Sequence, residues 1–128
     1  MKIVSLYTSL LLVVYFALSI NTIRKRRKTK ISLGHLENPE MLRAIRAHSN
    51  FAEYVPLNLF ALYLVESQGA PLLLSHFLGF STLLGRLLHA YGITQNNENF
   101  KFRVTGMMLT FTVMLSAASY LAFLFFKN

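Results

Sequence analysis

The 128-residue chain contains no cysteine. Disulfides, thiolate metal sites and a protein-borne thiol nucleophile are therefore excluded, and any thiol chemistry has to use a thiol that arrives with a ligand. Charged residues are scarce as well: they make up 14% of the chain, and only five of them are acidic. The sequence has no Gly-rich phosphate loop, no internal repeat and no histidines and carboxylates at metal-ligand spacing. We therefore expect no bound metal.

Hydrophobic residues, by contrast, make up 54% of the chain, and its mean hydropathy is +0.45. This composition is too apolar for an ordinary soluble domain. About 20 residues are needed to cross the bilayer core, and three of the four apolar runs approach that length. The second run, 52–65, becomes a full span if its helix begins near Pro39, for which Asn38 is a suitable N-cap. We predict an all-α membrane protein, a single domain over 1–128 and an up-down bundle of four transmembrane helices with spans 3–20, 42–66, 72–91 and 104–126.

Basic residues are distributed unevenly between the two sides of this bundle. Eleven of them border the first-to-second and third-to-fourth connections, namely Arg24, Lys25, Arg26, Arg27, Lys28, Lys30, Arg43, Arg46, Arg86, Lys101 and Arg103. Only Lys2 and Lys127 lie on the other side. By the positive-inside rule, both basic loops are expected in the cytoplasm and both termini outside.

The end of the first span and the basic cluster after it have two other interpretations. Residues 17–19 have the form of a signal-peptide cleavage site, but the apolar run before them is longer than a typical h-region, and the basic cluster after them resembles a stop-transfer signal. The cluster 24–30 also suits a nucleic-acid patch or a lipid-headgroup anchor. It has no interleaved aromatics and directly follows a span, which favours a juxtamembrane role in setting topology. We expect no nucleic-acid partner.

Four polar residues at the start of the second span indicate a binding site. At the 3.6-residue helical repeat, Arg43, Arg46, Asn50 and Glu53 fall within a stripe roughly 80° wide, so their side chains emerge from one side of the helix. An ionisable side chain at membrane depth costs about 2.5–3.5 kcal/mol on insertion scales. A shared stripe of such groups therefore favours contact with a partner, a cavity or a ligand over contact with lipid.

The motif formed by Arg46, Asn50, Glu53, Tyr54 and Pro56 resembles the MAPEG superfamily, the membrane-associated proteins in eicosanoid and glutathione metabolism. The resemblance covers nearly the whole chain, extends to Arg86 and Arg103 in the third and fourth spans, and is strongest to the small bacterial branch. It implies a homotrimer of four-helix subunits in the bacterial inner membrane. It also implies that glutathione binds between neighbouring subunits near the cytoplasmic face.

The chemistry of glutathione fits the residues that match this motif. Glutathione carries two carboxylates, an ammonium and a thiol, so its site needs guanidinium groups, an acid and a positive group near the sulfur. The resemblance implies a carboxylate on Arg46, the ammonium on Glu53, and backbone or carboxylate groups on Asn50. Tyr54 points about 80° away from Arg46, toward the ligand or toward a neighbouring helix or chain. The third-span residues Arg86 and His89 would complete the wall.

The expected reaction uses glutathione as a cosubstrate. Arg103 would stabilise its thiolate, with Lys101 as the fallback. The thiolate would then conjugate a lipophilic electrophile from the bilayer or reduce a lipid hydroperoxide, and the sequence does not decide between them. The resemblance is incomplete, since Ser49 replaces an arginine of some members, so the ligand or its affinity can differ.

Several alternatives stay open. Arg46 and Glu53 can instead belong to an intramembrane ion-pair network with Arg86, and Arg103 can simply flank its span. The protein can also be a non-catalytic trimer that binds glutathione. A small multidrug transporter has the same span number, but the first span here has no acidic residue to couple protons. We interpret His48 and His76 as packing or interface groups, and Asn58 as a hydrogen-bonding group between helices.

Overall fold

The computed structural model describes residues 2–127, and they form four α-helices. These are α1 (Lys2–Thr29), α2 (Pro39–Ser67), α3 (Leu72–Thr94) and α4 (Phe100–Lys127). The predicted all-α class is confirmed, and each helix contains one of the four apolar runs. α1 continues beyond its apolar run to Thr29, because arginine and lysine are good helix formers and their charge is favourable at the negative end of a helix.

α2 begins where the sequence predicts. Asn38 is the N-cap, its side-chain oxygen accepts a hydrogen bond from the backbone N–H of Met41 at 2.9 Å, and Pro39 is the first helical residue. Proline loses nothing at this position, because the first N–H groups of a helix have no partner within it. The helix therefore starts three turns before its apolar run and includes the whole polar motif.

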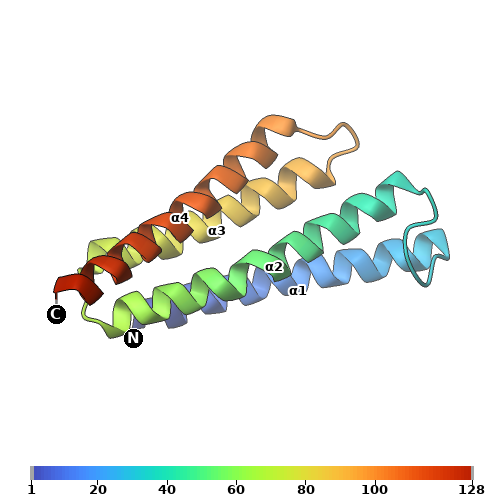
Figure 1. The fold of residues 1–128 in the computed structure, drawn as a ribbon. Helices are drawn as coiled ribbons and strands as arrows, with labels where there is room; N and C mark the ends of the chain where they lie inside the picture. Colours follow the sequence, from blue (N-terminus) through green and yellow to red (C-terminus); the bar gives the residue numbers. More distant parts are fainter. Residues whose placement is uncertain (1, 128) are drawn as a thin grey trace.

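The four helices form two antiparallel pairs, α1 with α2 and α3 with α4 (Figure 1). The pairs lie close together at the end that holds both termini and diverge toward the α1–α2 and α3–α4 connections. α2 contacts each of the other three helices, whereas α1 and α4 do not contact each other within residues 2–127. The two basic connections therefore lie at the same end, as an up-down arrangement requires.

Three helices, α1, α3 and α4, are long and apolar enough to cross a membrane. α2 is equally long, with 29 residues, but its polar residues lower its hydropathy. The architecture is consistent with a helical bundle in a membrane, in which α2 and α3 each contact all three other helices.

Two hydrophobic clusters join the helices. The first lies toward the termini and takes side chains from all four helices, including Tyr7, Leu62 and Val113. The second lies toward the basic connections and takes side chains from α1, α2 and α3, including Leu18 and Phe51. Because α4 contributes only to the first cluster, a different contact has to hold it against α3 near the basic connections.

That contact is a close approach of the α3 and α4 backbones at three glycines, Gly85, Gly92 and Gly106. A Cβ atom on Gly85 would lie 2.9 Å from the carbonyl oxygen of Gly106, and one on Gly106 would lie 2.7 Å from the backbone nitrogen of His89. A Cβ on Gly92 would lie 2.8 Å from the backbone nitrogen of Arg103. Small residues allow such close helix packing in membranes, and larger ones would force the helices apart.

We predict that Gly106→Leu separates α3 from α4. The added side chain overlaps α3, and overpacking of this kind typically costs about 1–3 kcal/mol. Thermal unfolding in detergent should show the loss. Ala118→Leu is the matched control, because Ala118 lies exposed on the same helix and its substitution should change stability little. Equal stability of the two variants would contradict the packing assignment.

Candidate functional site

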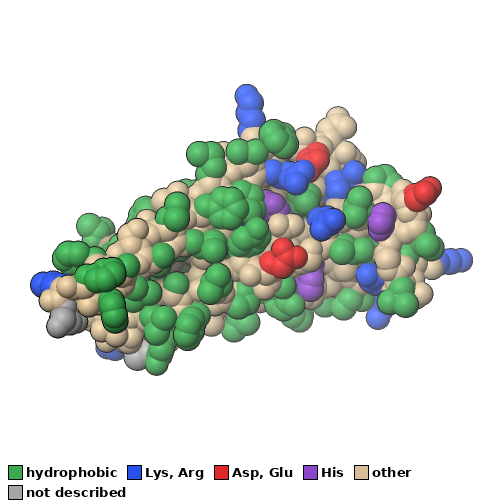
Figure 2. Space-filling view, viewed as in Figure 1, with side chains coloured by type: hydrophobic (Ala, Val, Ile, Leu, Met, Phe, Trp, Pro, Cys, Tyr) green, Lys and Arg blue, Asp and Glu red, His purple; other side chains and the backbone are tan. Residues whose placement is uncertain are grey.

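The polar motif lies on the surface of the first half of α2. Arg46 and Glu53 are exposed, and Asn50 is half-buried. The Asn50 side-chain nitrogen donates a hydrogen bond to the backbone carbonyl of Arg46 at 2.9 Å, which holds the amide against its own helix. Figure 2 shows charged and histidine side chains gathered mainly around the diverging end of the bundle, while hydrophobic side chains cover most of the other half. The candidate residues of α2 therefore lie at one end of an otherwise apolar surface.

Arg86 is the most deeply buried charged residue described, with 1% of its surface exposed. Its Nη2 donates hydrogen bonds to the Gly106 carbonyl oxygen at 3.1 Å and to the Thr110 hydroxyl, and it lies 3.4 Å from the Met107 sulfur. Its Nε and Nη1 are also buried and have no hydrogen-bond partner. A hydrogen bond to a charged group contributes about 1.5–3 kcal/mol, so burying two nitrogens without an acceptor is energetically unfavourable.

Tyr54 joins α2 to both α3 and α4. The Arg86 guanidinium carbon lies 5.4 Å from the centre of the Tyr54 ring, within the range of a cation–π contact. The Phe111 ring meets Tyr54 edge to face, with centroids 5.9 Å apart. Within the subunit, Tyr54 therefore contacts two neighbouring helices and covers one side of the Arg86 guanidinium.

His89 and Arg103 line the same surface hollow between α3 and α4. Its volume is about 230 Å³, and most of its other lining residues are apolar, including Met107 and Phe111. The Arg103 guanidinium forms an ion pair with Glu98 through Nη1, and its Nε is buried without a partner. The hollow therefore offers apolar contact surface beside a cation, which suits a lipophilic molecule with a reactive polar end.

The charges of the candidate site do not neutralise one another within one subunit. Among residues 2–127, no ion pair joins Arg46, Glu53 and Arg86. Glu53 has no ion pair with any described residue, and Arg86 has no carboxylate beside it. Within the described residues of one subunit, these three residues therefore do not form an ion-pair network.

The other polar residues singled out in the sequence have structural contacts. His48 stacks on Tyr15, with ring centroids 4.8 Å apart, and its Nε2 lies 3.1 Å from the Ser19 hydroxyl. The His76 Nδ1 lies 3.2 Å from the hydroxyl of Tyr7. Asn58 donates a hydrogen bond from α2 to Thr82 of α3 at 3.4 Å, as predicted. In the described part of the chain, no group of three or more histidine and acidic residues is arranged to hold a metal ion.

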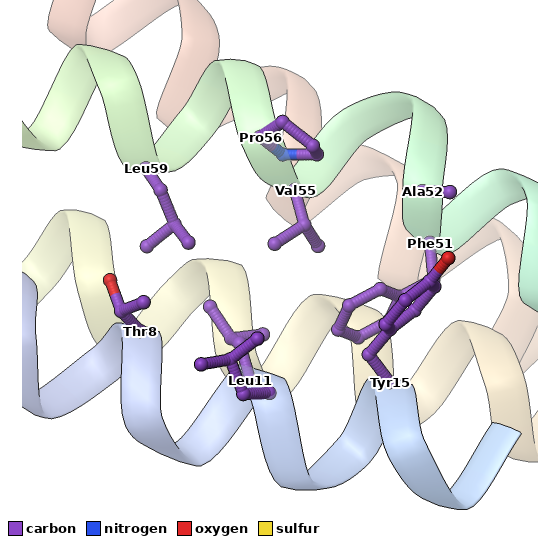
Figure 3. Close-up of a pocket in the computed structure, with 9 residues that line it drawn as sticks. Thr8, Leu11, Tyr15, Phe51, Ala52, Val55, Pro56 and Leu59 are labelled. Carbon is purple, nitrogen blue, oxygen red and sulfur yellow. The ribbon is translucent and has the colours of Figure 1, made fainter. Parts of the chain in front are cut away.

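An apolar hollow of about 410 Å³ lies between α1 and α2 (Figure 3). Leu11, Val55 and Leu59 point into it, and the Tyr15 and Phe51 rings close one end. None of its lining residues carries a charge. It therefore offers binding surface for a hydrocarbon group but none of the charged side chains that a charged tripeptide needs.

Sequence reasoning missed three residues that shape the site. Gly106 and Thr110 supply the acceptors of Arg86, and Glu98 pairs with Arg103. The spacing of Gly106 and Thr110, four residues apart on one helix face, is a small-residue pattern that indicates close helix packing. It does not indicate which helix packs there. The Glu98 contact depends on the path of the α3–α4 connection, which has no recognisable pattern in the sequence.

We predict that Thr110→Val lowers the free energy of unfolding by about 1–3 kcal/mol, because the buried guanidinium loses an acceptor. In an Arg86→Met background the same substitution should have little effect, since the group that needed the acceptor is gone. Unfolding of the four proteins in detergent without ligand measures this coupling. Equal effects of Thr110→Val in the two backgrounds would show that the hydrogen bond does not contribute to stability.

Comparison with known proteins identifies the family of the chain. The sequence profile of the MAPEG family matches residues 4–123, a range that includes every candidate residue above. Two curated relatives, both named Inner membrane protein YecN and found in Escherichia coli K12 and Escherichia coli O6:H1, are each 31% identical to this chain over 111 residues. The similarity covers 87% of this chain and 83% of each relative. The chain belongs to the MAPEG family.

Proposed function

We propose that the protein is a glutathione-dependent membrane transferase or peroxidase that acts on lipophilic substrates. The family is associated with glutathione, and the observation that carries the proposal is the buried Arg86, which has two nitrogens without acceptors and no carboxylate beside it. A buried cation of this kind is suited to an anionic ligand. Glutathione, with two carboxylates and a thiol that ionises, is such a ligand.

In the proposed complex, the groups of glutathione are held by residues of α2 and α3. Arg46 binds a carboxylate through its guanidinium fork, and Glu53 binds the ammonium. Asn50 contributes its amide after release from the Arg46 carbonyl. Tyr54, Arg86 and His89 form the inner wall, with the unused nitrogens of Arg86 as donors.

We further propose that the site is completed by neighbouring subunits of a homotrimer. Arg46 and Glu53 are exposed in a single chain, yet they belong to a helix whose neighbours are long enough to cross a membrane. Ionisable groups in such a position favour contact with a protein surface or an aqueous cavity over contact with lipid. A second chain packed against α2 would supply that surface. The proposed location is the inner membrane, with both basic connections in the cytoplasm and both termini outside.

In the proposed mechanism, Arg103 stabilises the glutathione thiolate. A free thiol has a pKa of about 8.5, and lowering it by about two units requires about 2.7 kcal/mol, within the range of one hydrogen bond to a charged group. For conjugation, the sulfur then forms a bond to an electrophilic carbon while the leaving group departs with its electron pair. For a hydroperoxide, the thiolate sulfur attacks the terminal oxygen and the O–O bond breaks. The departing alkoxide takes up the proton that the thiol had released, which gives an alcohol and the sulfenic acid of glutathione. A second glutathione then reduces the sulfenic acid, giving a disulfide and water.

One observation favours a second candidate, a trimer that binds glutathione without turning it over. Arg103 is already paired with Glu98, and a guanidinium that is neutralised by a carboxylate stabilises a thiolate less well. Ultraviolet absorbance of bound glutathione near neutral pH distinguishes the two candidates. An enzyme should raise the thiolate absorbance, whereas a binder should leave it unchanged.

The proposed site predicts how two substitutions change glutathione binding. Arg46→Ala and Glu53→Gln should each weaken glutathione binding by about thirtyfold or more, the lower end of the loss that follows removal of one member of a desolvated charge pair. Titration calorimetry of the detergent-solubilised protein measures this. Lys127→Gln, at the other end of the bundle, is the control for a general charge effect. Unchanged affinity in both site variants would reject the site.

The proposed mechanism predicts how substitutions of Arg103 change catalysis. Arg103→Ala should change glutathione affinity by less than about tenfold, because the carboxylates and ammonium are held elsewhere, while conjugation of a hydrophobic electrophile falls by about a hundredfold. Arg103→Lys should lie between alanine and wild type, since lysine keeps the charge but not the fork. If Arg103→Ala is fully active and Lys101→Ala is inactive, the role belongs to Lys101. Absence of any turnover in the wild type with electrophiles and hydroperoxides would support the binder.

A further inference from the structure

A small polar pocket lies among α1, α2 and α3 at the basic end of the bundle. Its volume is about 120 Å³. Its lining residues are Asn21, Lys25, Glu40, Arg43, Ala44 and Thr94. Lys25 and Arg43 are cations, and Asn21 and Thr94 can hydrogen-bond to an anion. None of the pocket residues belongs to the proposed glutathione site.

Arg43 is the unsatisfied group of this pocket. Its Nε is shielded from solvent and has no hydrogen-bond partner, and no other hydrogen bond or ion pair joins its guanidinium to a described residue. Glu40 does not neutralise it, because that carboxylate is paired with Lys25 and lies 3.6 Å from the Lys28 ammonium. The pocket therefore keeps a half-buried cation that is available for an anion.

The pocket continues into an apolar groove. The groove lies between α1 and α3, has a volume of about 340 Å³, and shares Asn21 and Thr94 with the polar pocket. From these two residues it runs back along both helices past Leu18 and Ala90 to Val14 and Leu87. Both helices are apolar and long enough to cross a membrane, so this direction leads from the basic end into the hydrophobic part of the bundle.

We propose that the pocket and the groove together bind one anionic phospholipid. The phosphate accepts hydrogen bonds from Arg43 and Asn21 in the pocket, and an acyl chain lies in the groove between α1 and α3. A free phosphate would satisfy the pocket alone, whereas the continuity of cationic pocket and apolar groove matches an amphiphile. Arg24, Arg27 and Lys30 are exposed around the same end and attract an anionic membrane surface. This proposal does not depend on glutathione binding.

The test uses the full-length protein in detergent, stripped of co-purified lipid. Native mass spectrometry follows the binding of phosphatidylglycerol and of phosphatidylcholine with the same acyl chains, each with and without excess inorganic phosphate. We expect one phosphatidylglycerol per chain to bind more tightly than phosphatidylcholine and to resist displacement by phosphate. Equal affinity for the two lipids would overturn the proposal. Displacement of the lipid by inorganic phosphate would also overturn it, since it would identify a free-anion site.

Two matched pairs of variants locate the site. Arg43→Gln should weaken phosphatidylglycerol binding by about tenfold or more, while Arg24→Gln, which removes the same charge from an exposed position outside the pocket, should change it less than about twofold. Ala17→Phe fills the groove from the exposed face of α1 and should weaken binding similarly, and Ala118→Phe on the exposed face of α4 is its control. Equal losses within either pair would show diffuse charge or general lipid contact and would reject the site. Because Ala17 is exposed, its variant remains informative even if Arg43→Gln fails to fold.

Discussion

The packing of α3 against α4 is constrained by the buried guanidinium of Arg86, which needs hydrogen-bond acceptors. A charge can stay in an apolar interior only if protein groups replace its water. Here the Gly106 carbonyl and the Thr110 hydroxyl do so from α4, and they come within reach because Gly85 and Gly106 let the two backbones approach closely. The nitrogens of Arg86 that have no acceptor then link the packing of α3 and α4 to the proposed binding of an anion.

α2 connects this packing to the surface. Like α3, it contacts all three other helices, and its inward and outward sides carry different residues. Tyr54 turns inward and covers Arg86, whereas the adjacent Glu53 and Arg46, about two turns earlier, stay exposed and without ion partners in the described subunit. In the proposed complex, a second chain and the ligand supply the partners of these exposed charges. This is why the proposed site and the proposed trimer depend on each other.

The basic end of the bundle contains two separate sets of cations with different surroundings. Arg43 and Arg46 are less than one helical turn apart, yet Arg43 lines a pocket with α1 and α3, while Arg46 remains on the exposed face of α2. The six basic residues of 24–30 lie in the last turns of α1 and directly after it, and they do not all act alike. Arg26 donates hydrogen bonds to backbone carbonyls of the following connection, at 3.0 Å for Ser32, and thereby holds the chain as it turns toward α2. One basic cluster thus supports the structure of the connection and is also proposed to set the topology and to attract anionic lipid.

The sequence by itself determined the helical class, the four apolar runs, the start of α2 at Asn38 and the family, because these depend on local hydrogen bonding, on apolar run length and on residue spacing within one helix. It also brought Arg46, Asn50 and Glu53 to one region, since they lie on one helix at helical spacing. Only the tertiary structure decided that Arg86 meets Tyr54 and Thr110, that Arg103 meets Glu98, and that Arg43 joins a pocket with Asn21 and Thr94. These contacts join different helices or depend on the path of a loop. They form where glycines let two helices approach closely and where a buried charge meets an acceptor. The residue spacing within one helix does not show which other helix lies beside it.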